Sequence, residues 1–227
     1  TINASGGDVT LGRAGMGDSF GSSVAADSRF GTLRVVSVNT LNVEAAINAG
    51  VFQQDSASAN ATTTFNGALN LDNGVAATVL SLTNIPNVVF GNGATVTTGT
   101  TGSVSLDGDT TGNLTVGTGA WTLNGDFTES DFGTFTLSAD FSAAGNVNIN
   151  DQLLLDADVT ISGANVTFSN TINSLTAPAR SEEGRVGKEC RSRWAPYPEQ
   201  KQTTRCTNRV HQHRPSRSQD TISPRAP

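Results

Sequence analysis

The first 179 residues contain no cysteine, lysine, histidine or tyrosine, and their basic residues are Arg13, Arg29 and Arg34 alone. The absence of cysteine excludes disulfide cross-links there. No run of about 18 apolar residues occurs, so the sequence predicts no membrane-spanning helix. Charged and aromatic residues are sparse, at 15% and 6% of the chain. Because little material is available for one wide globular core, we expect many thin layers, each holding one or two apolar side chains.

The composition changes abruptly at Arg180. Eleven of the 14 Lys and Arg residues, both Cys, both His and the single Tyr follow this point, whereas 15 of the 20 acidic residues precede it. The formal net charge is 3 − 15 = −12 before the break and 11 − 5 = +6 after it, which together give the −6 of the whole chain. We therefore predict a structured region, residues 1–179, and a separate basic tail, residues 180–227.

Apolar residues occupy alternate positions in the stretch 146–173, which reads NVNIN, DQLLLDADVTISG and ANVTFSNTIN. Successive side chains of a strand point to opposite faces, so a period of two predicts strands. Gly, Asn and Asp bound each run, and these residues favour turns. The stretch is therefore predicted to be a series of short strands joined by turns.

The same unit recurs along the structured region, as two or three alternating residues followed by Asn or Gly, at residues 63–67, 88–93, 114–117, 121–125 and 159–163. The clearer repeats are roughly 20 to 25 residues apart, a spacing typical of solenoids. We predict an all-β fold, a parallel β-helix in which each strand pairs with its equivalent one coil on. Like residues such as Asn or Thr then form ladders, and stacking supplies the core.

An antiparallel sandwich or meander is the alternative. Asn-Gly pairs at residues 66–67, 73–74, 92–93 and 124–125 are typical of two-residue β-hairpins. The strands are, however, very short and numerous, and they lack the longer Tyr-, Trp- and Val-rich runs of sandwich cores. The sequence therefore favours the solenoid.

The segments TTTFNGAL, VVFGNGATV, GNLTVGTGAWTLNGDFT and VTISGANVTFSNTINSL, all within residues 62–175, resemble the repeat regions of large bacterial exoproteins. These are the filamentous-haemagglutinin-like and autotransporter-like adhesins with β-strand repeats. The resemblance, which covers residues 1–179, implies a right-handed β-helix, export across the outer membrane and a role as an adhesive stalk. The chain begins within its repeating pattern, without an initiator Met or signal peptide, and we interpret it as an internal fragment.

The tail begins RSEEGRVGKECRSRWAPY, residues 180–197, which resembles the translation of a widely used short-read sequencing adapter. We interpret residues 180–227 as a non-native, read-through segment. The alternatives are a genuine disordered basic segment and, because Arg with Pro and Ser is common in such tails, a nucleic-acid-binding tail. We expect no nucleic-acid partner.

Two sets of residues resemble metal ligands. Cys190, Cys206, His211 and His213 include zinc-binding residue types, but neither Cys has a CxxC partner. Asp107-Gly108-Asp109 could belong to a calcium loop, yet it lacks the further acids of an EF-hand and the nonapeptide repeat of calcium-binding β-rolls. We interpret the second set as a turn and predict no metal and no cofactor.

Two groups of carboxylates could serve glycoside hydrolysis. Asp156 and Asp158 are two apart on a predicted strand and would share a face, and Asp126, Glu129 and Asp131 form the second group. Lyases acting on acidic sugars also need Arg or Lys, which are almost missing here. We interpret both groups as solvated turn residues and predict no catalytic residue.

The aromatic residues are predicted to lie inside the coils. Trp121, within Trp121-Thr122-Leu123, could be a platform for sugar stacking, but the alternation favours a core position. The same holds for Phe65, Phe90, Phe135 and Phe168. Asn-X-Ser/Thr sequons arise by chance in a sequence that is rich in Asn and Thr. We therefore assign no role to the sequons at Asn3, Asn60, Asn113 and Asn165.

From these observations we expect a structural or adhesive segment of a secreted or surface-anchored bacterial β-helix protein, without catalysis. Its expected location is extracellular or at the cell surface. Its expected partners are host-cell, matrix or polysaccharide surfaces and the neighbouring coils of the parent chain, with no membrane insertion by this segment. The alternative is a fragment of a β-helix polysaccharide lyase or glycoside hydrolase.

Overall fold

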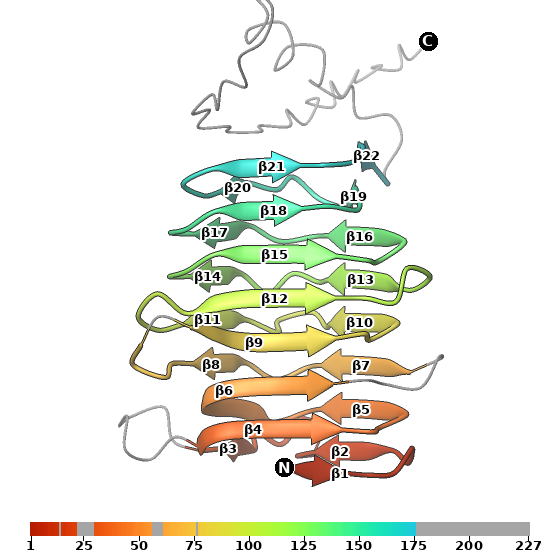
Figure 1. Cartoon of the computed structure of the whole chain (residues 1–227), viewed down its shortest axis with the longest axis vertical. Helices are drawn as coiled ribbons and strands as arrows, with labels where there is room; N and C mark the ends of the chain where they lie inside the picture. The colour runs from red at the N-terminus through yellow and green to blue at the C-terminus, as the bar shows by residue number, and fades with distance from the viewer. Residues whose placement is uncertain (14, 22–29, 56–60, 76, 176–227) are drawn as a thin grey trace, which may run out of the picture.

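The structure, a computed structural model, describes residues 1–13, 15–21, 30–55, 61–75 and 77–175. These residues form a parallel β-solenoid without a helix, in which short strands wind around one axis and the coils stack (Figure 1). From the N-terminal end upward, the strands nearest the viewer run to the right and those behind run back to the left, so the winding is right-handed. The predicted right-handed parallel β-helix is confirmed.

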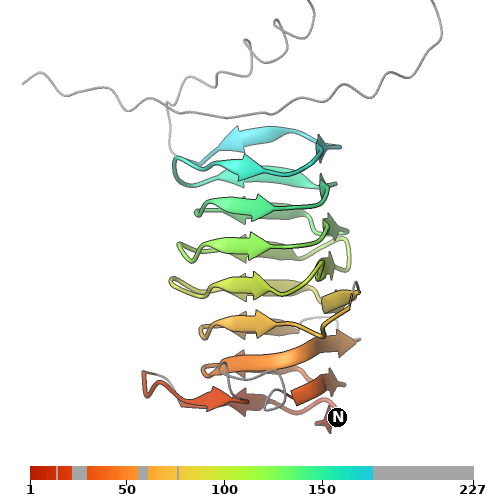
Figure 2. The ribbon, with the colours of Figure 1, turned by 90° about the vertical axis from the view of Figure 1, so that its left-hand side faces the viewer.

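Each complete coil contributes one strand to each of three faces, and the coils appear as flat, parallel layers from the side (Figure 2). The first face contains β1 (Ile2–Asn3), β4 (Phe30–Val36), the end of β6 (Ala46–Asp55), β9 (Thr78–Thr83), β12 (Ser103–Asp107), β15 (Phe127–Ser130), β18 (Val147–Ile149) and β21 (Val166–Phe168). The second face contains β2 (Val9–Leu11), β5 (Thr40–Val43), β7 (Thr62–Phe65), β10 (Asn87–Phe90), β13 (Asn113–Val116), β16 (Thr134–Leu137), β19 (Gln152–Leu155) and β22 (Ile172–Ser174). The third face contains β3 (Ser19–Phe20), the start of β6, β8 (Leu69–Leu71), β11 (Val96–Thr98), β14 (Trp121–Leu123), β17 (Phe141–Ala143) and β20 (Ile161–Ser162).

All pairings between the described strands are parallel and join equivalent strands of successive coils. The second face is an 8-stranded sheet, while the long strand β6 bends from the third face into the first and unites them in a 14-stranded sheet. The antiparallel alternative is therefore wrong for the described residues. The Asn-Gly pair at Asn66 shows why: the Asn66 N–H donates to the Val43 carbonyl of the preceding coil, so the turn stacks on that coil and closes no hairpin.

The inward-facing residues form a continuous aromatic spine. The rings of Phe65 and Phe90 stack at 4.8 Å between centroids, and Phe90 meets Trp121 edge-on at 4.6 Å. The spine continues from Trp121 to Phe141, and from there to Phe127 at 4.6 Å. Trp121, Phe65, Phe90 and Phe135 are buried as predicted, and Phe168 is half-buried in the last coil. Offset and edge-on ring pairs stabilise the stack beyond the area they bury.

Polar side chains form ladders at the corners of the rod. At the corner between the third and first faces, the Asn165 side-chain amide donates to Asn146 Oδ1, the Asn146 N–H to Asp126 Oδ1, and the Asp126 N–H to Ser103 Oγ. These residues are 19, 20 and 23 positions apart, respectively, close to the predicted repeat. The Asn165–Asn146 contact is of the expected kind, between like residues, whereas the other two join unlike residues and satisfy backbone N–H groups at the turns.

Candidate functional site

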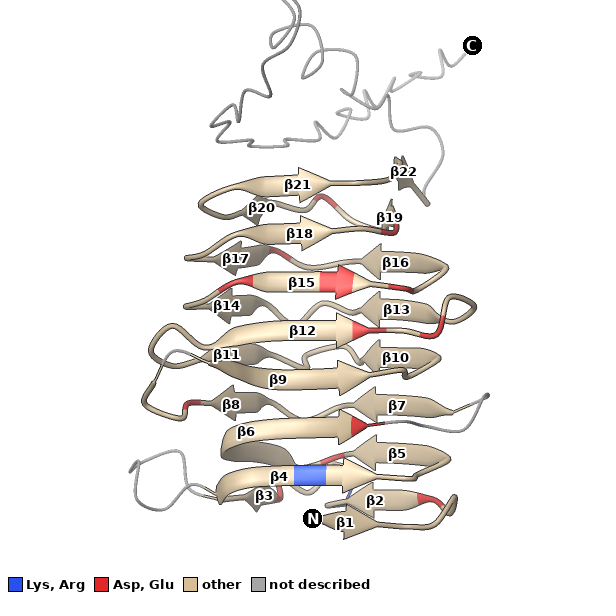
Figure 3. Ribbon diagram, viewed as in Figure 1, with Lys and Arg blue, Asp and Glu red and all other residues tan. Residues whose placement is uncertain are grey.

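The acidic residues lie mostly at strand ends and turns, and several come together on neighbouring coils (Figure 3). We call Asp107, Glu129, Asp131 and Asp151 the acidic corner, because they lie where the first face turns into the second. Asp107 ends β12, Glu129 lies in β15, Asp131 follows β15, and Asp151 precedes β19. Strand register brings them together, since Asp107 pairs with Ser130 and Glu129 with Ile149.

Glu129 is the buried member of the acidic corner, with 0% of its surface exposed. It takes an inward position of the first face that Leu106 and Ile149 take in the adjacent coils. Its Oε2 accepts the backbone N–H of Asn150 at 3.1 Å, and its carbonyl accepts the Asn150 side-chain amide at 2.8 Å. Its Oε1 is buried without a hydrogen-bond donor. Burial is the main cause that raises the pKa of Glu129 to about 8. The neighbouring Asp151 contributes to this rise in pKa, through a hydrogen bond and through its negative charge.

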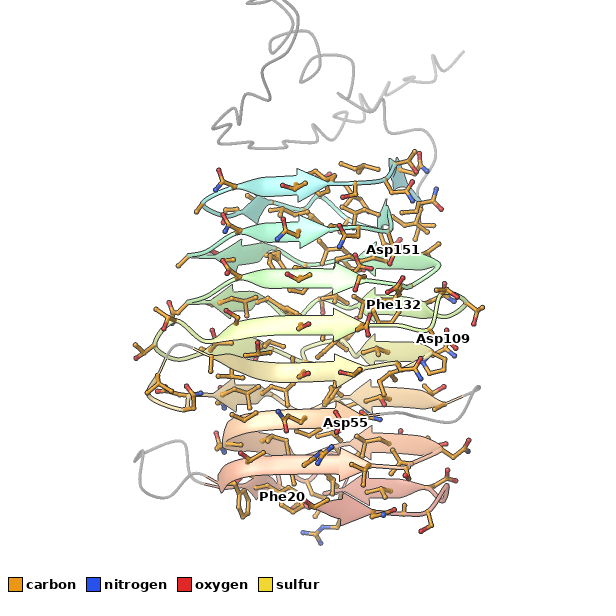
Figure 4. The ribbon with its side chains drawn as sticks, viewed as in Figure 1. Phe20, Asp55, Asp109, Phe132 and Asp151 are labelled. Carbon is orange, nitrogen blue, oxygen red and sulfur yellow. The ribbon has the colours of Figure 1, made fainter. Side chains whose placement is uncertain are left out.

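Asp151 links two coils at this corner. Its Oδ2 accepts the backbone N–H of Phe132 at 2.6 Å, and Phe132 is itself buried beneath the turn that follows β15. Figure 4 shows Asp151 and Phe132 near one another on this side of the rod. Sequence reasoning did not select Asp151, because its partner Glu129 is 22 residues earlier. Asp151 can be identified from the sequence only if the repeats are aligned in the register that pairs Glu129 with Ile149.

Asp131 is the exposed member of the acidic corner, and it adopts a positive φ of 60°. The pKa of the Asp131 carboxyl is raised above its ordinary value. Loss of hydration is the main cause, and the charge of Asp107 and a hydrogen bond with it add to the shift in pKa. Asp107 in turn accepts a hydrogen bond from Ser130 Oγ at 3.1 Å. Asp107 and Asp131 thus bring two negative charges to this corner of the surface.

Asp109 closes its own turn and does not join the cluster. Its Oδ1 accepts the N–H groups of Thr111 and Gly112 and the Thr111 hydroxyl, at 2.9 to 3.1 Å. The Thr111 N–H, as the main donor, lowers the pKa of Asp109. Of the predicted turn, Asp107 lies at the end of β12, whereas Gly108 and Asp109 lie in the connection to β13, the protruding loop of Figure 4. Among the described residues, no group of three or more His, Cys, Asp or Glu side chains is arranged to hold a metal ion.

The structure separates the other carboxylates that the sequence grouped. Asp126 lies in the turn before β15 and Asp131 in the turn after it, so the two flank the strand at opposite corners. The assignment of Asp156 and Asp158 to a strand is wrong, because β19 ends at Leu155 and both residues are exposed in the connection to β20. The apolar alternation misled the prediction: it continues into the half-buried Ala157 and buried Val159, which also face the core while the chain turns.

Three further predictions concern aromatic, glycan and metal-binding residues. Trp121 is 1% exposed, so its ring has no surface for sugar stacking. Asn3, Asn113 and Asn165 are exposed. Asn60, Cys190, Cys206, His211 and His213 lie outside the described residues, as does the tail from residue 180, so their predictions remain untested.

The architecture defines the molecule as a right-handed parallel β-solenoid. Comparison of the chain with protein families, with curated proteins and with solved structures found no match. Within the part that the structure describes, no helix is long and apolar enough to cross a membrane. The fold alone is compatible with a stalk and with an enzyme, so the choice between them depends on the geometry of the side chains.

Proposed function

We propose that the chain is a structural or adhesive segment of a large bacterial surface protein, a rod that spaces or presents contact regions outside the cell. Its partners in this role are host-cell, matrix or polysaccharide surfaces, together with the next coils of the parent chain. The resemblance of its repeats to those of bacterial adhesins supports this role, and the parallel solenoid is compatible with it.

The observation that carries the proposal is that both layers of the rod repeat along its axis. Inside the rod, ring contacts link successive coils from Phe65 to Phe141, and at the corner polar side chains link Asp126, Asn146 and Asn165 of successive coils. In such a stack, each coil contributes stability mainly through its neighbours, so length is gained by adding coils. A spacer needs this property, whereas an enzyme needs convergent groups at one place.

The acidic corner does not fit either geometry of glycoside hydrolysis. Glu129 is fully buried and has no access to a polymer. The Asp107 carboxyl accepts a hydrogen bond from Ser130 Oγ, and the pKa of the exposed Asp131 is raised mainly by loss of hydration, so no described cation or donor prepares the two for hydrolysis, which needs two carboxyls about 5–9.5 Å apart. The described basic side chains, Arg13 and Arg34, are paired with Asp18 and Asp55 in the first coils, away from this corner.

A retention assay tests the proposal. Beads carrying the full chain are applied to surfaces coated with matrix proteins or with neutral and acidic polysaccharides, beside beads carrying an unrelated β-rich protein. Newly released reducing ends and unsaturated sugars are measured in the same wells. Retention without release supports an adhesive segment, and neither retention nor release supports a spacer. Release of sugar that Asp131→Asn abolishes would overturn the proposal and place catalysis at the acidic corner.

The double variant Asp156→Asn with Asp158→Asn is expected to behave like the parent chain. Both side chains are exposed in a connection, and surface substitutions of this kind change the free energy of unfolding by about 0.5 kcal/mol or less. Unfolding by urea, followed by circular dichroism, and the sugar-release assay check this together. Cleavage that is present in the parent and lost in the double variant would contradict the non-catalytic role.

A further inference from the structure

We infer that Glu129 and Asp151 share one proton inside the rod, and that this proton holds two successive coils together at the acidic corner. The proposal begins with the Glu129 carboxyl, whose two oxygens differ. Oε2 accepts backbone N–H groups from Asn150 and Asp151, at 3.1 and 3.4 Å, while Oε1 is buried with no donor. A buried carboxylate oxygen without a donor is costly, but a protonated one becomes a donor itself.

The surroundings supply an acceptor for that proton and no compensating cation. The titratable groups of the neighbouring elements are Asp107 at the end of β12, Asp131 in the turn after β15 and Asp151 before β19, all acidic. The Asp151 N–H lies 3.4 Å from Glu129 Oε2, and the Asp151 carboxyl is the acidic neighbour that raises the pKa of Glu129 after burial itself. When a buried carboxyl group such as Glu129 has a second carboxyl group as its neighbour, it retains its proton because two adjacent charges cannot both be stabilised.

The shared proton adds a further contact between the turn that follows β15 and the turn that follows β18. Asp151 holds the Phe132 N–H of the turn that follows β15, and Glu129 holds the Asn150 and Asp151 N–H groups of the turn that follows β18. With the proton in place, the two carboxyl groups attract each other across the corner. Without it, two negatively charged carboxylates of successive coils repel each other. The corner is therefore a pH-sensitive element of the rod.

The direction of the pH effect follows from proton linkage. Glu129 has a pKa near 8 in the folded chain and 4.5 as its ordinary value, so between these limits the folded state binds more protons than the unfolded state. Stability is then fully present below about pH 4.5 and is lost as the pH rises through 8. One such group lowers the folding equilibrium constant by up to about tenfold per pH unit within this window.

Glu129→Gln tests the inference in the full chain. Its amide donates permanently to Asp151, and its oxygen still accepts from the backbone. We expect urea unfolding midpoints, measured from pH 5 to 9, to fall with rising pH in the parent and to be nearly flat in the variant. At pH 8.5 the variant should be the more stable, by at least about tenfold in the folding equilibrium constant. Asp126→Asn, at the other end of β15, is the matched control and should keep the parental slope.

A variant that is less stable than the parent at pH 8.5, or that retains the parental slope, would overturn the inference, because Glu129 would then act as an ionised acceptor. A second measurement needs no stability comparison. The infrared spectrum of the folded parent at pH 7, minus that of Glu129→Gln, should contain the carbonyl band of one protonated carboxylic acid. If that band is missing, the shared proton does not exist. Asp151→Asn should shift the band rather than remove it, because burial still raises the pKa of Glu129 while the acceptor of its proton becomes an amide.

Discussion

Replacing Trp121 by Ala is expected to destabilise the rod by about 3–5 kcal/mol, the range found for large aromatic side chains removed from cores. Trp121 contacts three other rings of the aromatic spine. Its ring centroid lies 4.6 Å from that of Phe90, 5.5 Å from that of Phe141 and 6.0 Å from that of Phe127. Because Phe90 belongs to the coil before that of Trp121, and Phe127 and Phe141 to the coil after it, the cavity weakens the interfaces on both sides of β14. Urea unfolding followed by circular dichroism measures the loss.

Hydrogen exchange distinguishes a local cavity from a broken stack. In a solenoid, stability is carried by interfaces between nearest neighbours, so a defect in the middle uncouples the two halves. We expect amide protection to fall in β11, β14 and β17 together. Thr122→Ala, one residue away on the outward side of the same strand, is the matched control and should change the unfolding free energy by about 0.5 kcal/mol or less. Equal effects of the two substitutions would refute the spine as the main source of stability.

The fold class could be predicted from the sequence because its physical cause is local. Alternation in TFT, LTV and VTF determines which side chains face inward, and the Gly and Asn residues determine where the chain turns. The absence of Cys excluded disulfide cross-links, and the scarcity of charged residues left few ion pairs to stabilise so thin a core. The burial of Phe65, Phe90 and Trp121 followed from the same alternation.

The acidic corner could not be predicted, because it depends on register between coils of unequal length. Equivalent residues are 26 positions apart from Asn87 to Asn113, 21 from Asn113 to Thr134 and 19 from Gln152 to Thr171. A fixed repeat length therefore misplaces a residue by several positions after one coil. Glu129 was grouped with its chain neighbour Asp126, although its structural partner is Asp151. Phe132 was missed for a related reason, since the turn at Asp131 directs it inward outside the alternating pattern.

Close approach of backbone to backbone at the corners gives the second large prediction. Gly112 precedes β13 and lies directly over Pro86 of the previous coil. A Cβ atom at Gly112 would be 1.4 Å from the Pro86 carbonyl oxygen and 2.2 Å from its carbon. Neither atom belongs to a side chain that can rotate away, and the ring of Pro86 fixes its backbone further. We expect Gly112→Ala to destabilise the chain by about 3 kcal/mol, at the upper end of overpacking costs.

Gly31→Ala provides the comparison that isolates this clash. A Cβ atom at Gly31, in β4, meets nothing within 4 Å, and neither glycine has a positive φ. The change to alanine lowers the entropy of the unfolded chain equally at both sites, which favours folding by about 0.4–1 kcal/mol. Gly31→Ala should therefore be neutral or slightly stabilising in thermal and urea unfolding, while Gly112→Ala unfolds far earlier. If both variants unfold together, Gly112 does not lie over Pro86, and the register that pairs Val88 of β10 with Leu114 of β13 would have to be reassigned.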